Sequence, residues 1–152
     1  MQRVITKALQ RYWRLSRGLT LGAQGCVIDS HNRVLLIRHT YRPGWFFPGG
    51  GVEKAETVEE SLARELWEEA GVRIGRAAPQ LFGLYANHKR YPGDHIALFV
   101  VRDWEQPVPP RPNREIAAHQ FVDPADLPAD IHPPTAARIA EIFAGTPRSQ
   151  VW

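Results

Sequence analysis

Three glutamates in one segment have a spacing that could hold a divalent cation against phosphate. Glu65, Glu68 and Glu69 follow a glycine-rich stretch and lie in a run of good helix formers. On a helix their side chains fall within an arc of about 100°. Like charges this close cost roughly a few tenths of a kcal/mol per pair, and partial burial adds to the cost. A bound Mg²⁺ or Mn²⁺ would reverse this balance, because both ions take oxygen ligands and share them with phosphate groups.

These glutamates belong to a longer pattern. For an isolated E-x-x-E-E run, a solvated acidic helix face would be the simpler interpretation. Here the run is part of the pattern G-x5-E-x7-R-E-L-x-E-E-x-G-V, which extends from Gly50 to Val72 with no position missing. So many fixed residue types rarely coincide by chance. The complete pattern therefore favours a site over a solvated face.

The pattern resembles the signature box of the Nudix hydrolases at every defining position. The resemblance implies an α/β protein, a Nudix-type α/β/α sandwich with a mixed β-sheet. It also implies a metal-dependent pyrophosphohydrolase, with Mg²⁺ or Mn²⁺ as cofactor. The substrate would be a nucleoside diphosphate linked to another moiety, such as a nucleotide or a nucleotide sugar. Water attack on phosphorus needs charge neutralisation and positioning, which acidic residues and metal ions supply without a nucleophilic side chain.

The resemblance also assigns roles to individual residues. Glu65, Glu68 and Glu69 are the implied metal ligands and general base, without a distinction as to which is the base. The backbone carbonyl of Gly49 is a further implied metal ligand. Arg64 is expected to orient a catalytic carboxylate.

The remaining box positions have structural roles. Glu56 is expected to fix the loop against the helix, and Gly50 is the box glycine. Thr57 and Glu60 form a capping-box pair that predicts a helix over residues 57–70. Gly71 follows at the place where a left-handed C-cap is commonest. The helix face expected to point into a core comprises Val58, Leu62, Ala63, Leu66 and Ala70.

Basic residues upstream of the box could contact substrate phosphates. Arg38, His39 and Arg42 precede the glycine turn. Cationic surface decoration is the alternative interpretation for each of them.

Other candidates lie apart from this group. Glu115 is in a region where family members often carry an additional glutamate that binds metal or acts as base, and a solvated loop glutamate is the alternative. Trp45 and Tyr91 could stack on a base, although aromatic side chains near a sheet more often pack in the core or at its rim. His95, at the start of a strand, is expected to be structural.

Strands are predicted to surround the box helix. They lie at residues 19–29, 33–39, 80–87 and 94–101, and a further short strand is expected to end at Phe121 and Val122. A second helix spans 134–144. Residues 30–32 are short enough to join the first two strands as a hairpin. The proline-rich stretch 103–113 is predicted to be a loop.

Length and composition agree with one small enzyme. The chain has 152 residues, and we expect a single domain at 18–152. Hydrophobic residues make up 43% but form no long run, so no transmembrane segment is expected. Cys26 is the only cysteine and is predicted to be a buried thiol. Nothing indicates an oxidising compartment, so a cytoplasmic location is expected.

Residues 1–17 contain five cationic and no acidic side chains, interleaved with apolar ones, and predict a basic amphipathic helix. Such a helix could touch a membrane surface or an acidic partner, or serve as a transit peptide. We favour a helix packed on the domain or on a second subunit, which makes a homodimer possible.

The sequence narrows the partners only to a class. A net charge of +3 suits an anionic substrate, so a phosphorylated, nucleotide-type small molecule is expected. The 5′ end of an RNA is possible but not favoured, because no basic, aromatic-rich sheet is evident. A catalytically silent nucleotide-binding or regulatory Nudix module is the alternative, and the intact set of glutamates favours catalysis.

Overall fold

The order of elements follows the predicted alternation of strands around a central helix. The computed structural model describes Tyr12 and residues 16–152, so the predicted helix at 1–17 lies almost wholly outside the described residues. The elements are β1 (Thr20–Val27), β2 (Val34–His39), β3 (Gly49–Gly51), α2 (Val58–Ala70), β4 (Arg73–Ile74), β5 (Gln80–Ala86), β6 (Asp94–Val101), β7 (Trp104–Glu105), β8 (Ile116–Val122) and α3 (Pro133–Phe143).

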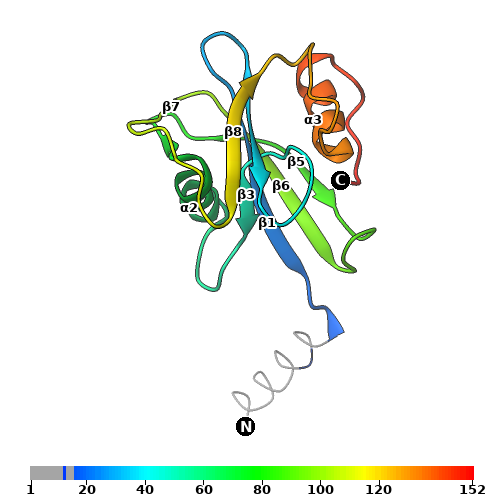
Figure 1. The fold of residues 1–152 in the computed structure, drawn as a ribbon. Coiled ribbons are helices and arrows are strands. Elements are labelled where there is room, and N and C mark those ends of the chain that lie inside the picture. The colour runs from blue at the N-terminus through cyan, green and yellow to red at the C-terminus, as the bar shows by residue number, and fades with distance from the viewer. Residues whose placement is uncertain (1–11, 13–15) are drawn as a thin grey trace.

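Four strands form a mixed sheet in the order β3-β1-β6-β5. β1 runs parallel to β6 and antiparallel to β3, and β5 runs antiparallel to β6. β2 pairs with β8 in a second, antiparallel sheet, and β4 pairs with β7 in a third. α2 and α3 lie on opposite sides of the strands, as Figure 1 shows. The predicted α/β/α sandwich with a mixed sheet is confirmed.

Alternate residues of the same strands fill two separate cores. Val27 of β1 and Leu35 of β2 pack with Leu62 and Leu66 of α2. Their chain neighbours face the other way and belong to the core under α3, with Ile139. Strands buried on both faces carry near-continuous apolar runs, which explains why these segments show no polar alternation.

The turn between β1 and β2 is tight, but the two strands do not form the predicted hairpin ladder. The Asp29 carboxylate accepts hydrogen bonds from the backbone N–H groups of His31 and Arg33, and Asn32 has φ of 58°. The strands then share one bridge, between Ile28 and Val34, and separate into different sheets. Both edges of β1 are already occupied by β3 and β6, so β2 pairs with β8 instead.

Two further boundaries differ from the prediction. β8 is seven residues long and extends back to Ile116, because it pairs with β2 along its length. Within the stretch predicted to be a loop, Trp104 and Glu105 form β7 against β4. Long-range pairing turns weakly patterned residues into strands, and local sequence carries little sign of it.

α2 has the predicted ends. The Thr57 hydroxyl accepts a hydrogen bond from the Glu60 N–H, and the Glu60 carboxylate accepts one from the Thr57 N–H. Gly71 forms the left-handed C-cap with φ of 61°. Leu62, Leu66 and Ala70 are buried, whereas Ala63 is exposed and does not belong to the predicted apolar face.

Among the described residues, no helix is both long and apolar enough to cross a bilayer. Cys26 is a free, fully buried thiol, as predicted, and burial raises its pKa far above the usual range.

Candidate active site

Arg64 joins the loop before α2 to the acidic face of the helix. Its guanidinium donates hydrogen bonds to both carboxylate oxygens of Glu56, at 2.9 and 3.0 Å, and to the Gly51 carbonyl at 3.1 Å. It also lies 2.5 Å from Glu65 Oε1 and 3.5 Å from Glu68 Oε2. The hydrogen bonds from Arg64 lower the pKa of Glu56 to about 2. Arg64 therefore contacts both the loop and the acidic helix face. Its role in orienting a catalytic carboxylate, and that of Glu56 in fixing the loop, stay predictions.

Glu69 is the buried member of the acidic face. It is 8% exposed, and its Oε2 accepts a 2.7 Å hydrogen bond from the Gly49 N–H. Burial raises the pKa of Glu69 to about 8, and the negative charges of Glu65 and Glu115 add to the shift. The Gly49 hydrogen bond and the charge of Arg42 oppose it only in part. The buried Glu69 carboxylate is therefore only partly compensated by positive charge and hydrogen bonding.

Two glycines make room for the carboxylates. A Cβ on Gly50 would lie 2.3 Å from Glu65 Oε1, so only a glycine lets that carboxylate approach the loop. Gly49 has φ of 149°, and a Cβ there would lie 2.2 Å from the Ala23 carbonyl oxygen. The backbone of the glycine-rich turn therefore lies close to the acidic face of α2.

The His39 ring lies between Glu69 and Arg42. Arg42 Nη2 is 2.7 Å from His39 Nε2, and since Arg42 can only donate, His39 Nε2 accepts. Burial, with a smaller effect from Arg42, lowers the pKa of His39 to about 4, so its ring is neutral near pH 7. The proton of the neutral ring is then on Nδ1, 4.0 Å from Glu69 Oε1. Arg42 also stacks on Phe46 at 3.9 Å from the ring centroid.

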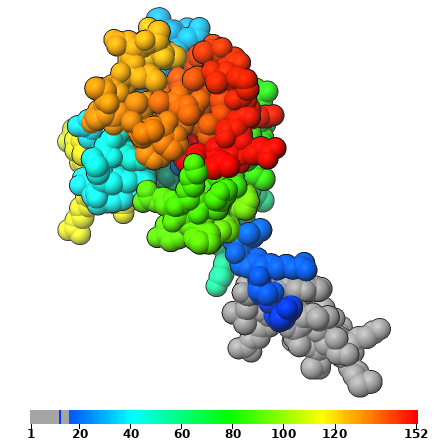
Figure 2. Space-filling model, turned by 90° about the vertical axis from the view of Figure 1, so that its right-hand side faces the viewer, coloured from blue at the N-terminus to red at the C-terminus, as the bar shows by residue number. Residues whose placement is uncertain are grey.

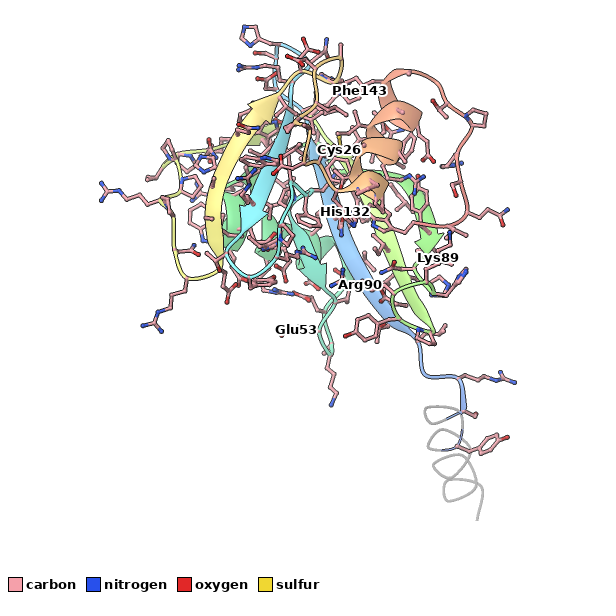
Figure 3. The ribbon with its side chains drawn as sticks, turned by 45° about the vertical axis from the view of Figure 1, so that its right-hand side comes forward. Cys26, Glu53, Lys89, Arg90, His132 and Phe143 are labelled. Carbon is pink, nitrogen blue, oxygen red and sulfur yellow. The ribbon has the colours of Figure 1, made fainter. Side chains whose placement is uncertain are left out.

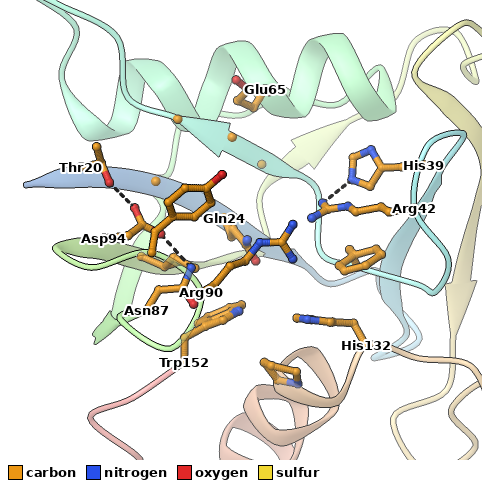
Figure 4. Close-up of a pocket in the computed structure, with 18 of the residues that line it drawn as sticks. Thr20, Gln24, His39, Arg42, Glu65, Asn87, Arg90, Asp94, His132 and Trp152 are labelled. Carbon is orange, nitrogen blue, oxygen red and sulfur yellow. Dashed lines mark hydrogen bonds between the residues drawn. The ribbon is translucent and has the colours of Figure 1, made fainter.

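These groups line a cleft of about 900 Å³ between α2, the main sheet and α3. Glu65 and Glu69 lie on its α2 side, and Figure 4 shows Arg42 and Arg90 in the same cleft, away from α2. Lys89 and Arg90 come from the loop after β5, and His132 is the residue before α3 (Figure 3). The cleft thus has an acidic side and a cationic side, an arrangement suited to a metal ion and the phosphates that it neutralises.

A polar cluster closes one edge of the cleft. The Asp94 carboxylate accepts hydrogen bonds from the Thr20 hydroxyl at 2.6 Å and from the Asn87 side-chain amide at 2.8 Å, as Figure 4 shows. Asn87 also donates its backbone N–H to the Asp94 carbonyl. These bonds hold the loop that carries Lys89 and Arg90 against β1.

Most of the predicted site residues meet in this cleft. The predicted residues among those that line it are Gly49, Gly50, Glu65, Glu69, His39, Arg42, Tyr91 and Glu115. Glu68 does not line the cleft, because its side chain is 56% exposed and contacts Arg64 instead. Across the described part of the chain, no three His, Cys, Asp or Glu side chains converge to hold a metal by themselves.

Arg38 and Trp45 are placed elsewhere. Trp45 is 7% exposed and packs in the core under α3. Arg38 lies over its ring, 4.6 Å from the centroid, and makes a 2.5 Å ion pair with Asp130. Arg38 alternates with its neighbours along β2, and the pairing of β2 with β8 decides which face it takes. The structure does not bring these two residues to the cleft.

Several cleft residues have no counterpart among the sequence candidates. Lys89 and Arg90 form a cationic run in the loop 88–93, and that run was the available signal. His132 has a pKa lowered to about 4, chiefly by burial and then by the charges of Arg42 and Arg90. Trp152 reaches the cleft from the segment after α3, and no local pattern predicts this.

A family model, the NUDIX domain, matches residues 18–143. The chain belongs to the Nudix family. The predicted family and the enzyme class, a Nudix hydrolase acting on diphosphate bonds, are confirmed.

The relatives of this chain have names that state different substrates. This Nudix chain is 30% identical over 125 residues to a MutT-like protein of Streptomyces ambofaciens, covering 82% of the chain and 72% of that protein. It is 35% identical over 89 residues to an 8-oxo-dGTP diphosphatase of Proteus vulgaris, covering 55% and 76%. It is 34% identical over 102 residues to an ADP-ribose pyrophosphatase of Methanocaldococcus jannaschii, covering 65% and 59%.

Solved Nudix structures share the fold. A MutT NUDIX hydrolase from Burkholderia pseudomallei superposes with a TM-score of 0.69 at 21% identity, covering 82% of this chain and 98% of that one. An ADP-ribose pyrophosphatase from Streptococcus suis gives 0.62 at 23% identity, covering 88% and 95%. At these identities the likeness shows the fold and leaves the substrate open.

Proposed function

We propose that this Nudix hydrolase is a metal-dependent pyrophosphohydrolase, which cleaves a nucleoside diphosphate linked to another moiety by water attack on phosphorus. One observation carries the proposal. Buried Glu69 and its neighbour Glu65 face the same cleft as Arg42 and Arg90. A cleft with carboxylates on one side and guanidinium groups on the other fits a bound cation and a polyphosphate chain together.

The donors available fit Mg²⁺ or Mn²⁺. Glu65, Glu69 and the Gly49 carbonyl offer oxygen only, the ligand type that hard cations prefer. Mg²⁺ is usually held by one or two carboxylates plus substrate phosphates, so two cleft carboxylates suffice without a third. Burial, and then the negative charges of Glu65 and Glu115, raise the pKa of Glu69, and a bound dication would favour its ionised form. When bound, the ion would lower the pKa of a water molecule and offset the charge of the phosphates.

The remaining residues have distinct tasks in this proposal. Arg64, held by Glu56, fixes the Glu65 carboxylate at the mouth of the glycine turn. Arg42, Lys89 and Arg90 would bind phosphate oxygens from the opposite side. Glu115 lines the cleft and is exposed, so it can add a ligand or accept a proton from water.

The cleft and two of the named relatives support a nucleotide-type substrate. Their names include an 8-oxo-dGTP diphosphatase and an ADP-ribose pyrophosphatase, and both substrates are nucleotides with a diphosphate bond. We propose a nucleotide-type substrate for this chain as well. The cytoplasm remains the proposed compartment, because Cys26 is buried and unpaired.

The test is hydrolysis of a nucleotide panel by the native protein and by Glu69→Gln. The panel comprises nucleoside triphosphates, 8-oxo-dGTP, ADP-ribose, nucleotide sugars, dinucleoside polyphosphates and triphosphorylated RNA. With Mg²⁺ or Mn²⁺ we expect turnover of one class, abolished by EDTA and restored by metal. Glu69→Gln should lower kcat on the order of 10³-fold, since charge neutralisation by a metal is worth several kcal/mol.

Glu59→Gln is the matched control, because Glu59 is exposed on the same helix and its side chain makes no hydrogen bond or ion pair in the described structure. It should retain full activity. Turnover that resists EDTA would contradict the metal mechanism. Metal-dependent nucleotide binding with no turnover of any panel member would support the silent binding module instead.

A further inference from the structure

The segment after α3 is bound to the edge of the main sheet. The Ala86 N–H donates to the Gln150 carbonyl at 2.9 Å, and the Trp152 N–H donates to the Ala86 carbonyl at 3.0 Å. Val151 bridges Ala86 in parallel orientation, so the segment extends the sheet beyond β5. Figure 2 shows this segment in red, packed against the green β5–β6 region. It lies outside residues 18–143, which the family model matches.

A buried ionic cluster fixes the segment in this position. Arg138 Nη2 donates to Glu141 Oε1 at 2.7 Å, and the other Glu141 oxygen accepts from the Tyr85 hydroxyl at 2.8 Å. Arg138 also donates to the Val151 carbonyl at 3.0 Å, and Glu141 accepts from the Ser149 N–H at 2.9 Å. Arg138 and Glu141 are 4% and 7% exposed. Their charges are compensated by each other and by the segment they hold, so the segment is a built part of the domain.

This anchoring delivers the indole of Trp152 to the cleft. Its ring meets Tyr85 edge to face, with centroids 5.5 Å apart, and Arg138 lies 5.7 Å from its centroid. Trp152 also lines the cleft, together with His132 and Arg90. In Figure 4, Trp152 and His132 lie at one end of the cleft, and Glu65 lies on α2 at the other.

We propose that Trp152 is a specificity-determining residue that stacks on the base of the substrate. The proposal rests on the function proposed above, which places phosphates and metal next to α2. A nucleotide bound in that way must extend its base away from the acidic helix face, towards the end formed by Trp152 and His132. An indole presents a wide π-face at low entropic cost, and stacking tolerates any base.

Binding measurements can separate the base from the phosphates. Isothermal titration with ADP, GDP, CDP and UDP is compared with inorganic pyrophosphate, which has no base, in the presence of Mg²⁺. In the native protein, at least one nucleoside diphosphate should bind more tightly than pyrophosphate. In Trp152→Leu this advantage should fall about tenfold to a hundredfold, while pyrophosphate affinity is unchanged.

Trp152→Phe is the matched partner of Trp152→Leu. Both keep apolar bulk against Tyr85, but only phenylalanine keeps a π-face, so Phe should retain most of the preference. Trp67→Leu, a half-exposed indole on α2 outside the cleft, should change nothing. A purely structural role would affect pyrophosphate and nucleotides alike and would not separate Phe from Leu.

The inference is overturned if the native protein binds no nucleoside diphosphate more tightly than pyrophosphate. It is also overturned if Trp152→Leu keeps the native difference between these affinities, or if Trp152→Phe and Trp152→Leu bind alike. None of these outcomes depends on turnover. A protein that binds nucleotides through Trp152 without hydrolysing any would contradict the proposed function and leave the stacking role standing. Turnover of a nucleotide, combined with unchanged nucleotide binding in Trp152→Leu, would support the proposed function and contradict the stacking role.

Discussion

At the residue scale, the site depends on a glycine whose lack of a side chain leaves room for a carboxylate. Gly50 leaves the space that the Glu65 carboxylate occupies, and a methyl group there would lie 2.3 Å from Oε1. Arg64 holds the same carboxylate from the other side. Glu65 is thus confined between a guanidinium and a stretch of bare backbone, which limits the positions from which it can bind a cation.

We expect Gly50→Ala to fold but to need more metal for activity, because the added Cβ displaces the Glu65 carboxylate. Activation curves with Mg²⁺ should shift to higher concentration by at least about tenfold. The adjacent Gly51→Ala is the control, since a Cβ at that position meets nothing within 4 Å. Equal metal dependence in the two variants would remove the role assigned to Gly50.

At the element scale, α2 is joined to the loop that precedes it by one ionic contact. Glu56 accepts two hydrogen bonds from Arg64 and one from the Glu53 N–H. The capping box at Thr57 fixes the first turn, and the Gly51 carbonyl accepts from Ser61 and Arg64. The loop and the helix therefore form one unit, and the spacing within the box is what allows it.

This contact predicts a pH dependence of stability. The pKa of Glu56 is lowered from 4.5 to about 2, so the carboxylate stabilises the fold above about pH 4.5. Its contribution is lost as the pH falls through 2. Urea unfolding of the native protein and of Glu56→Gln should differ at pH 6 and converge towards pH 2. A difference that stays constant over this range would show that the charge of Glu56 is not the cause.

At the scale of the whole molecule, the strands separate two cores and the cleft opens where the layers diverge. Cys26 lies in the core under α3 and is fully buried. Its pKa is raised by desolvation, so neither access nor ionisation favours reaction. Its reactivity therefore reports on the packing of both layers around β1.

A thiol reagent such as dithiobis-nitrobenzoate should label Cys26 at least about 10³-fold more slowly in the native protein than in urea, because labelling requires global opening. The rate should follow the free energy of unfolding across destabilised variants. Fast labelling of the native protein would show that β1 opens locally without unfolding of the domain.

The sequence by itself determined the box helix, its caps, and the contacts that form within and just before it. These features depend on residues a few positions apart, and helix geometry brings such residues together whatever the rest of the chain does. The same locality explains the close agreement for β6 and for the ends of α2. It also explains why the acidic face could be identified from spacing alone.

Only the tertiary structure decided which residues share the cleft. The pairing of β2 with β8 directs Arg38 elsewhere, and the bridge to Ile131 holds Trp45 against the segment before α3. Glu68 points to solvent beside buried Glu69. Lys89, Arg90 and Trp152 reach the cleft through loops and a docked segment far from the box in sequence. Strand edges accept partners from anywhere in the chain, so the order β3-β1-β6-β5, not the local pattern, sets these positions.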